Sequence, residues 1–320
     1  MAGKPLALQL CSYSDYLTAG LSALVDPVRW FELDAAAQGH FLASRAGEVR
    51  VVATGGHLGC PSDLMRALPA LELVAINGVG FDKVDLGVAE ACGVMVSNTP
   101  DVLNEDVADL AVGMVIGLMR QLPQCDAFVR SGNWLNGEIG LSRKVSGSRF
   151  GIVGLGRIGR EIAARLAAFG PVAYSGRTRV EVGLPYFAEV SALAEWADVL
   201  IIACASTPET AGMIDAHVLA ALGERGYLVN IARGAVVDEA ALAQVIAEKR
   251  IAGAALDVFA HEPQVPAELI ASDRTMLAPH IASATHETRT AMADLVLANI
   301  EACLAGKVLV TPVPGTPARQ

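Results

Sequence analysis

Short apolar runs alternate with amphipathic segments through the first third of the chain. The expected strands lie at residues 6–11, 28–33, 49–54, 71–76 and 94–97. Segments with apolar residues at helical spacing separate these runs. Strands that alternate with helices form parallel sheets, because two parallel strands need a long crossover connection. The pattern therefore predicts a small parallel α/β domain over residues 1–99.

A second series of apolar runs begins at Phe150. The expected strands lie at residues 150–153, 172–174, 199–203, 227–230, 252–256 and 275–277. Helical segments again separate the runs, which predicts a doubly wound sheet of six strands.

Two long helices and one irregular segment complete the predicted organisation. One helix begins at Asn104, a residue type that caps helices, and is expected to connect the two domains. The segment 130–148 has several glycines and little periodicity, which predicts a loop or an arm. The last helix, about 286–305, returns the chain toward the first domain. Its apolar face is expected to consist of Ala291, Leu295, Ala298 and Ala302.

The stretch 150–170 contains a strand, a glycine turn and a helix in direct succession. Gly154 allows the turn, Gly156 lets the backbone approach a pyrophosphate, and Gly159 lets the helix pack on the strand. The helix N-terminus adds free N–H groups and a partial positive charge. The motif predicts dinucleotide binding. An ordinary glycine loop is the alternative, and the flanking strand and helix disfavour it.

The residues after the second strand of this region indicate which dinucleotide is bound. Units that bind NAD carry an acidic residue about 20 positions after the glycines. Here Ser175, Arg177, Thr178 and Arg179 occupy that region, and residues 172–179 include no carboxylate. A guanidinium and hydroxyls suit a 2′-phosphate, which a carboxylate would repel. The pattern predicts NADPH with Arg177 as the main anchor, and a solvated turn is the alternative.

Three later motifs follow expected strands and bring residues suited to carbonyl reduction. They present Arg233, Asp257 with Glu262, and His280. Reduction of a ketone leaves an alkoxide that needs a proton donor, and an imidazole such as that of His280 is suited to this role. A carboxylate such as Glu262 on the other ring nitrogen would favour the imidazolium and fix the ring. Arg233 offers a planar fork for the oxygens of a 2-oxo acid.

The loop within residues 76–85 follows the fourth strand of the first domain. Open α/β sheets bind ligands at the carboxyl ends of their strands, and Gly78 and Gly80 would expose backbone N–H groups there. A plain glycine turn is an equally good interpretation of this loop taken alone.

The composition of the chain argues against several classes of function. The net charge of −10 and the absence of a Lys/Arg cluster argue against nucleic-acid binding. The uncharged run 110–119 is too short to span a bilayer, and the first residues do not have the pattern of a signal peptide. Six scattered cysteines without a CxxC motif suggest free thiols in the cytoplasm. No spacing typical of a metal site or of a serine nucleophile is found.

Over nearly its full length the chain resembles the D-isomer-specific 2-hydroxyacid dehydrogenase family. The motifs that carry the resemblance are INGVGFDKVDL, NTPDVLNEDVADLAVG, GIVGLGRIG, NIARGAVVDEAAL, ALDVFAHEP and PHIASATHETR. Within the family the chain is most similar to the NADPH-using glyoxylate/hydroxypyruvate reductase branch, which also includes hydroxyphenylpyruvate reductases.

The resemblance implies roles for individual residues. Arg233, Glu262 and His280 become the substrate anchor, the acid partner and the proton donor, and Val79 and Gly80 offer N–H groups to the substrate carboxylate. The positions that usually touch the cofactor are Gly154, Leu155, Gly156, Arg157, Ile158, Gly159, Ser175, Arg177, Thr178, Thr207, Pro208, Ile231, Ala232 and Asp257. In related NADPH enzymes a Ser often precedes the phosphate-binding Arg, and Gly176 stands there in this chain. The common Lys before the glycine-motif strand is Ser148.

The resemblance also implies an architecture and an activity. A flavodoxin-like substrate domain (1–99 and 286–320) and a Rossmann cofactor domain (100–285) are expected, with the active site in the cleft between them and a homodimer formed through the cofactor domain. The expected activity is NADPH-dependent reduction of a small 2-oxo acid such as glyoxylate or hydroxypyruvate. The alternatives are an NAD-dependent relative that acts on hydroxyphenylpyruvate, phosphoglycerate or D-lactate, and a non-catalytic nucleotide-sensing protein.

Overall fold

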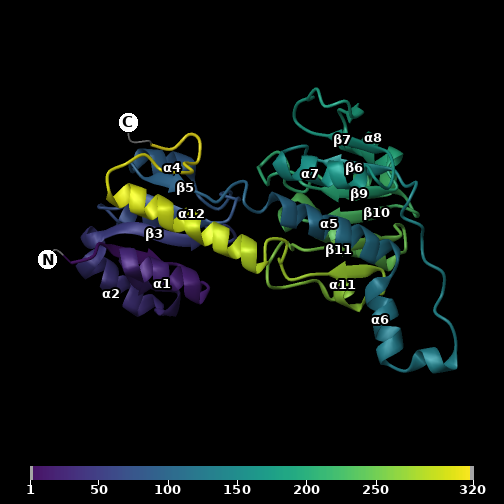
Figure 1. Cartoon of the computed structure of the whole chain (residues 1–320), viewed down its shortest axis with the longest axis horizontal. Coiled ribbons are helices and arrows are strands. Elements are labelled where there is room, and N and C mark those ends of the chain that lie inside the picture. Colours follow the sequence, from purple (N-terminus) through teal and green to yellow (C-terminus); the bar gives the residue numbers. More distant parts are fainter. Residues whose placement is uncertain (1–2, 318–320) are drawn as a thin grey trace. The chain divides into compact units, whose positions relative to one another are not determined.

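The computed structural model describes residues 3–317 and separates the chain into two compact units (Figure 1). Unit 1 comprises Met1–Leu103 and Thr285–Gln320, and unit 2 comprises Asn104–Ala284. The boundaries thus lie at 103/104 and 284/285, where the sequence suggested 99/100 and 285/286. Residues 1–2 and 318–320 of the expected first domain lie outside the described residues.

Unit 1 contains a five-stranded sheet in which all pairs of strands are parallel. Its strands are β1 (Leu6–Gln9), β2 (Asp26–Arg29), β3 (Val49–Gly55), β4 (Leu73–Asn77) and β5 (Met95–Ser97). The order β2-β1-β3-β4-β5 is that of flavodoxin-like sheets, which confirms the expected fold class. The predicted strand 28–33 is wrong over its second half. A 3₁₀ turn, η1 (Trp30–Glu32), begins there, and the Trp30 ring packs edge-on against Phe41.

Helices cover both faces of this sheet. They are α1 (Asp15–Leu24), α2 (Ala35–Arg45), α3 (Ser62–Ala67), α4 (Leu86–Ala91) and α12 (His286–Leu304), with the 3₁₀ turn η2 (Ala46–Glu48) after α2. Alternate residues of β4 point to opposite faces of the sheet. Leu73 and Ala75 pack under α1 and α12, whereas Val74 and Ile76 pack under α2, α3 and α4. A strand buried on both faces is therefore apolar throughout, as buried parallel strands are.

Helix α12 has the expected bounds but buries a different face. The predicted stripe through Ala291 and Leu295 is only half-buried, and the helix instead buries Val296, Ile300 and Cys303. These side chains pack on the sheet beside α1, which lies next to α12 (Figure 1). Alanines carry too little apolar surface to decide which face of a helix is buried, and the larger side chains determine it.

Unit 2 contains a seven-stranded sheet whose strand pairs are also all parallel. The strands are β6 (Phe150–Val153), β7 (Val172–Ser175), β8 (Tyr186–Phe187), β9 (Val199–Ile202), β10 (Tyr227–Asn230), β11 (Gly253–Leu256) and β12 (Thr275–Leu277). The order is β12-β11-β10-β9-β6-β7-β8. The six predicted strands are all present, and the sequence analysis missed β8, a two-residue strand too short to form an apolar run. The strand order reverses between β6 and β9, where doubly wound sheets bind ligands.

The helices of unit 2 also form two layers. They are α5 (Asn104–Met119), α6 (Leu122–Arg130), α7 (Arg157–Leu166), α8 (Val190–Trp196), α9 (Ala216–Leu222), α10 (Glu239–Ala247) and α11 (Ala267–Ala271), with the 3₁₀ turns η3 (Asn133–Asn136) and η4 (Gly234–Val236). Helices α8, α9, α10 and α11 pack on one face, and α5 packs on α7, β10, β11 and β12. Of the segment 130–148 predicted as a loop or an arm, Arg130 ends α6 and residues 133–136 form η3, whereas residues 137–148 form no helix or strand. Within the described part of the chain, no helix has the length and apolar character needed to cross a bilayer.

Candidate active site

The residues expected to touch a cofactor lie at the carboxyl ends of neighbouring strands of unit 2. The glycine motif follows β6, and Ser175 to Thr178 lie at and just after the end of β7. Thr207 and Pro208 lie after β9, and Ile231 and Ala232 lie directly after β10. Because β6 and β9 flank the point where the strand order reverses, these loops share one edge of the sheet.

The loop after β6 has the geometry that a pyrophosphate needs. Gly154 has a φ of +97°, and a Cβ at this position would lie 2.6 Å from the Cα of Cys204. A Cβ on Gly159 would collide with the carbonyl oxygen of Gly154, so larger residues would push α7 away from β6. Gly156 faces open space and precedes α7 without a side-chain cap, which leaves N–H groups of the helix N-terminus for an anion.

Two tyrosines shape the loop after β7. The Tyr174 hydroxyl donates to the carbonyl of Val180 at 2.9 Å and accepts from its N–H at 2.7 Å. The Tyr186 hydroxyl donates to the carbonyl of Gly176 at 3.1 Å. These bonds close residues 176–180 into a compact turn that presents Arg177 and Thr178 to solvent.

Arg177 also lies near the loop that follows β9. The pKa of Glu209 is below its ordinary value, chiefly because of a hydrogen bond with Thr207, and the positive charge of Arg177 contributes further. Arg177 has no carboxylate within ion-pair distance among residues 3–317, whereas Arg179 pairs with Glu181 at 3.6 Å. The Arg177 guanidinium is therefore available to an anionic ligand.

A histidine and a carboxylate form the centre of the candidate active site. Nδ1 of His280, after β12, lies 2.8 Å from one carboxylate oxygen of Glu262, after β11. The other carboxylate oxygen accepts the N–H of Phe259 at 3.0 Å. Burial raises the pKa of Glu262, but the hydrogen bonds from His280 and Phe259 and the charges of His280 and Arg233 outweigh it, so the pKa is lowered. Glu262 is thus ionised at neutral pH and holds the ring so that Nε2 is left for a substrate.

Asp257 ties the two loops together. Its fully buried carboxylate accepts the N–H groups of Ile281 at 2.7 Å and Ala282 at 2.9 Å. Its carbonyl accepts the N–H of His280 at 2.8 Å. Desolvation is the largest influence on this carboxyl group and raises its pKa. Both carboxylate oxygens are engaged with the chain, so the structure gives this side chain a positioning role.

Arg233 sits on a third loop, after β10, whose shape Asn230 fixes. The Asn230 side chain accepts the N–H of Ala232 and donates to the carbonyl of Arg233, both at 3.0 Å. The next residue, Gly234, touches the backbone of Phe259 and Ala260 so closely that any Cβ would collide with it. The loops carrying Arg233, Glu262 and His280 are therefore packed against one another.

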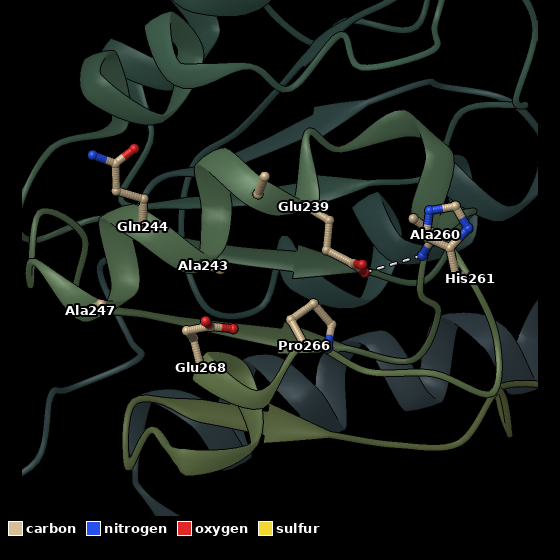
Figure 2. Close-up of a pocket in the computed structure, with 9 residues that line it drawn as sticks. Glu239, Ala243, Gln244, Ala247, Ala260, His261, Pro266 and Glu268 are labelled. Carbon is tan, nitrogen blue, oxygen red and sulfur yellow. Dashed lines mark hydrogen bonds between the residues drawn. The ribbon is translucent and has the colours of Figure 1, made fainter.

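Glu239, on helix α10, holds the Glu262 loop from outside. Its carboxylate accepts the N–H of Ala260 at 3.1 Å, and Figure 2 shows the side chain directed at that nitrogen. The contact lies at one end of a pocket of about 580 Å³ between α10 and α11. The pocket lining includes Gln244, His261 and Glu268, but it does not include Arg233, Glu262 or His280.

Val79 and Gly80 lie in unit 1, just after the end of β4. The carbonyl of Gly78 accepts the N–H of Thr99 at 2.9 Å, and the carbonyl of Val79 accepts the Asn98 side-chain amide at 2.8 Å. Neither the Val79 nor the Gly80 N–H has an acceptor in the described part of the chain. Two buried side-chain oxygens nearby, Oδ1 of Asn77 and Oγ1 of Thr99, also have no hydrogen-bond partner there. These two atoms are out of reach of a ligand, whereas Val79 and Gly80 are only partly buried and can offer their N–H groups to a polar ligand.

Sequence reasoning missed the residues that position this machinery. Asn98, Asn230 and Glu239 lie within the quoted motifs, whereas the two tyrosines do not. Asn98 and Glu239 each bond to a backbone group of another loop. Only Asn230, between a strand end and the Arg233 loop, had a local signal, because Asn side chains commonly bond to their own turn. In residues 3–317, no three His, Cys, Asp or Glu side chains are grouped to hold a metal ion.

Comparison with known proteins places this arrangement among dehydrogenases. Residues 112–282 match the model of the D-isomer specific 2-hydroxyacid dehydrogenase, NAD binding domain. The chain is 44% identical over 308 residues to glyoxylate/hydroxypyruvate reductase A of Arabidopsis thaliana, with 96% of this chain and 98% of the relative covered. The identity and coverage are the same for hydroxyphenylpyruvate reductase of Plectranthus scutellarioides.

A solved structure is similar over the whole chain. It is the NADPH-dependent glyoxylate/hydroxypyruvate reductase of Sinorhizobium meliloti in complex with NADP and malonate. The two chains superpose with a TM-score of 0.93 at 41% identity, with 99% of each chain covered. The resemblance inferred from the motifs is confirmed.

The Glu239 contact can be tested by amide hydrogen exchange. We expect Glu239→Ala to speed exchange in a peptide containing Ala260 by about five- to tenfold, because a lost hydrogen bond costs about 1 kcal/mol of local opening free energy. Glu239→Gln keeps an acceptor oxygen and should exchange like the parent chain. Glu268→Ala, in the same pocket, is the matched control. Equal exchange in the two alanine variants would contradict the anchoring role.

Proposed function

This chain belongs to the D-isomer specific 2-hydroxyacid dehydrogenase family, and on that premise we propose that it reduces a small 2-oxo acid, glyoxylate or hydroxypyruvate, to the 2-hydroxy acid. The observation that carries the proposal is the 2.8 Å contact between Nδ1 of His280 and the carboxylate of Glu262. The loop that carries Glu262 is packed against the loop that carries Arg233. NADPH, when bound, supplies the hydride.

In this proposal the protein supplies a proton and two fixed charges. Nε2 of His280 donates a proton to the carbonyl oxygen of the substrate as negative charge develops there. The Glu262 carboxylate contacts Nδ1 of the ring and keeps the ring oriented. The Arg233 guanidinium binds the carboxylate and carbonyl oxygens of the 2-oxo acid through its planar fork. Val79 and Gly80 donate their N–H groups to the substrate carboxylate, so unit 1 is the substrate-binding domain.

Unit 2 is the cofactor domain in this proposal. The glycine loop and the N-terminus of α7, including Leu155, Arg157 and Ile158, receive the pyrophosphate. Arg177 and Thr178 hold the 2′-phosphate, which the exposed guanidinium of Arg177 supports. Ser175, also expected there, is buried at the end of β7. The loops of Thr207 and Pro208, of Ile231 and Ala232, and of Asp257 border the nicotinamide end.

We choose a small 2-oxo acid because relatives are named glyoxylate or glyoxylate/hydroxypyruvate reductases. Hydroxyphenylpyruvate reductase of Plectranthus scutellarioides matches the chain with the same identity and coverage as the first of these. The relatives differ in the substrates they are named for, so the test must include both small 2-oxo acids and an aryl-pyruvate.

We also propose that the enzyme is cytoplasmic and forms a homodimer. A reducing cytoplasm suits its six cysteines, none of which forms a disulfide bond.

A homodimer formed through unit 2 is supported by exposed apolar side chains on α6 and the segment that follows. Trp134 is 66%, Leu135 92% and Leu141 101% exposed. Such a concentration of exposed apolar side chains is typical of a contact surface.

The substrate proposal is tested by initial rates with glyoxylate, hydroxypyruvate, hydroxyphenylpyruvate and pyruvate. We expect the first two to be preferred and His280→Ala to lower kcat by about 10²–10⁴, the usual contribution of a general acid. Unchanged turnover in that variant would remove His280 from the mechanism. Dinucleotide binding without turnover of any of the four would favour a nucleotide-sensing protein instead.

The cofactor proposal is tested by Arg177→Ala. We expect it to weaken NADPH binding by about 1.5–3 kcal/mol, the usual contribution of a hydrogen bond to a charged group, with little change for NADH. Arg179→Ala is the matched control, because Arg179 already pairs with Glu181. Fluorescence titration with both dinucleotides measures the difference. Equal losses for NADPH and NADH would contradict the proposal.

The dimer proposal is tested by analytical ultracentrifugation. We expect the parent chain to sediment as a dimer, and the double variant Leu135→Glu, Leu141→Glu to shift toward the monomer because two charges would have to be buried at the contact. Val310→Glu, at an exposed position in unit 1, is the control and should remain dimeric. A monomeric parent chain would overturn the proposal.

A further inference from the structure

The Val79–Gly80 loop is held by a series of hydrogen bonds that begins at the C-terminal helix. Asn299, fully buried on α12, donates to Oγ1 of Thr311 at 2.7 Å and accepts the Thr311 N–H at 3.0 Å. Thr311 Oγ1 donates to the carbonyl of Asn98 at 2.6 Å. The buried Asn98 side chain then donates to the carbonyl of Val79 at 2.8 Å.

These contacts fix the direction of two successive N–H groups. A trans peptide is planar, and its C=O and N–H point in opposite directions. The Gly78 carbonyl is bound by the Thr99 N–H, so the N–H of Val79 points away from the end of β5. The Val79 carbonyl is bound by Asn98, so the N–H of Gly80 points away from the same place. Two successive N–H groups directed to one side form an anion-binding concavity.

We infer that Asn98, supported by Thr311 and Asn299, is a positioning residue that orients the Val79–Gly80 peptide for the carboxylate of the substrate. The inference rests on the proposed function of this loop. The bond to Asn98 matters because it prevents rotation of the peptide plane. Were the peptide to flip, the Gly80 N–H would be replaced by the Val79 carbonyl oxygen, and a donor for the carboxylate would become a group that repels it.

The two bonds that orient the loop differ in their chemistry. The bond from Thr99 is made by the backbone, and it survives any substitution of a side chain other than by proline. The bond from Asn98 is made by a side chain and can be removed without changing the backbone of β5. The side chain of Asn98 is therefore the place where the orientation of the Gly80 N–H can be tested.

The test compares Asn98→Leu with the parent chain in glyoxylate reduction. We expect the KM for glyoxylate to rise about ten- to hundredfold, the loss expected when a hydrogen bond to a charged group is weakened. The kcat and the KM for NADPH should stay unchanged, because Asn98 bonds neither to His280 nor to the residues proposed to bind NADPH. Thr311→Val should raise the KM for glyoxylate less, and Thr311→Ser, which keeps the hydroxyl, should restore the parent value.

A control separates positioning from general stability. Gln38→Leu removes a side-chain amide that donates to the carbonyls of Trp30 at 3.2 Å and Leu33 at 3.1 Å elsewhere in unit 1. Loss of folded protein lowers the apparent kcat and leaves KM unchanged, so this variant should keep the parent KM. An unchanged KM in Asn98→Leu, or the same change in Gln38→Leu, would overturn the inference.

A binding measurement distinguishes failure of this inference from failure of the proposed function. Oxamate, a small carboxylate that the reaction does not consume, is titrated calorimetrically into each protein saturated with NADP⁺. If the parent chain reduces no 2-oxo acid, the proposed function fails, and weaker oxamate binding by Asn98→Leu than by the parent chain still supports the positioning role. Equal binding by the two proteins, or none by the parent chain, overturns it.

Discussion

The candidate active site depends on one buried carboxylate. Asp257 accepts two N–H groups from the loop that follows β12, and its own carbonyl accepts the N–H of His280. These bonds place His280 beside Glu262, although the two side chains come from different strands. A buried carboxyl group is stable only while its hydrogen bonds are made, so loss of this arrangement would leave an unsatisfied polar group in the core. The cost of burying Asp257 therefore makes the position of His280 specific.

Local anion-binding groups matter here because the whole chain is acidic. The formal net charge is −10, whereas a 2-oxo acid and NADPH are anions. The overall field does not favour their approach, so binding must come from groups within hydrogen-bond distance. The groups proposed for this role are the helix N-terminus after β6, the two N–H groups after β4, Arg177 and Arg233. Most of these donors belong to the backbone, and their directions depend on glycines and on polar side chains behind them.

Much of the fold was predictable, because strands buried on both faces form apolar runs and glycine turns mark their ends. The places of Arg233, Glu262 and His280 were also predictable, since each follows the end of such a run within six residues. Strand β8 could not be predicted, because two residues are too few to form a hydrophobic pattern. The buried face of α12 could not be predicted either, because alanines contribute little to the preference of a helix for one buried face. Asn98 and Glu239 could not be singled out. Each bonds to a backbone group on a separate loop, and a partner of that kind is defined only once the chain has folded.

The backbone of His280 has a φ of +54°, in the left-handed region. Few residues other than glycine adopt this conformation, and histidine, asparagine and aspartate do so more readily than most. A β-branched side chain would be strained at the same position. The repertoire of side chains that could evolve at this position is therefore narrow before any chemistry is considered. Of histidine, asparagine and aspartate, histidine is the one whose ordinary titration range lies near neutral pH.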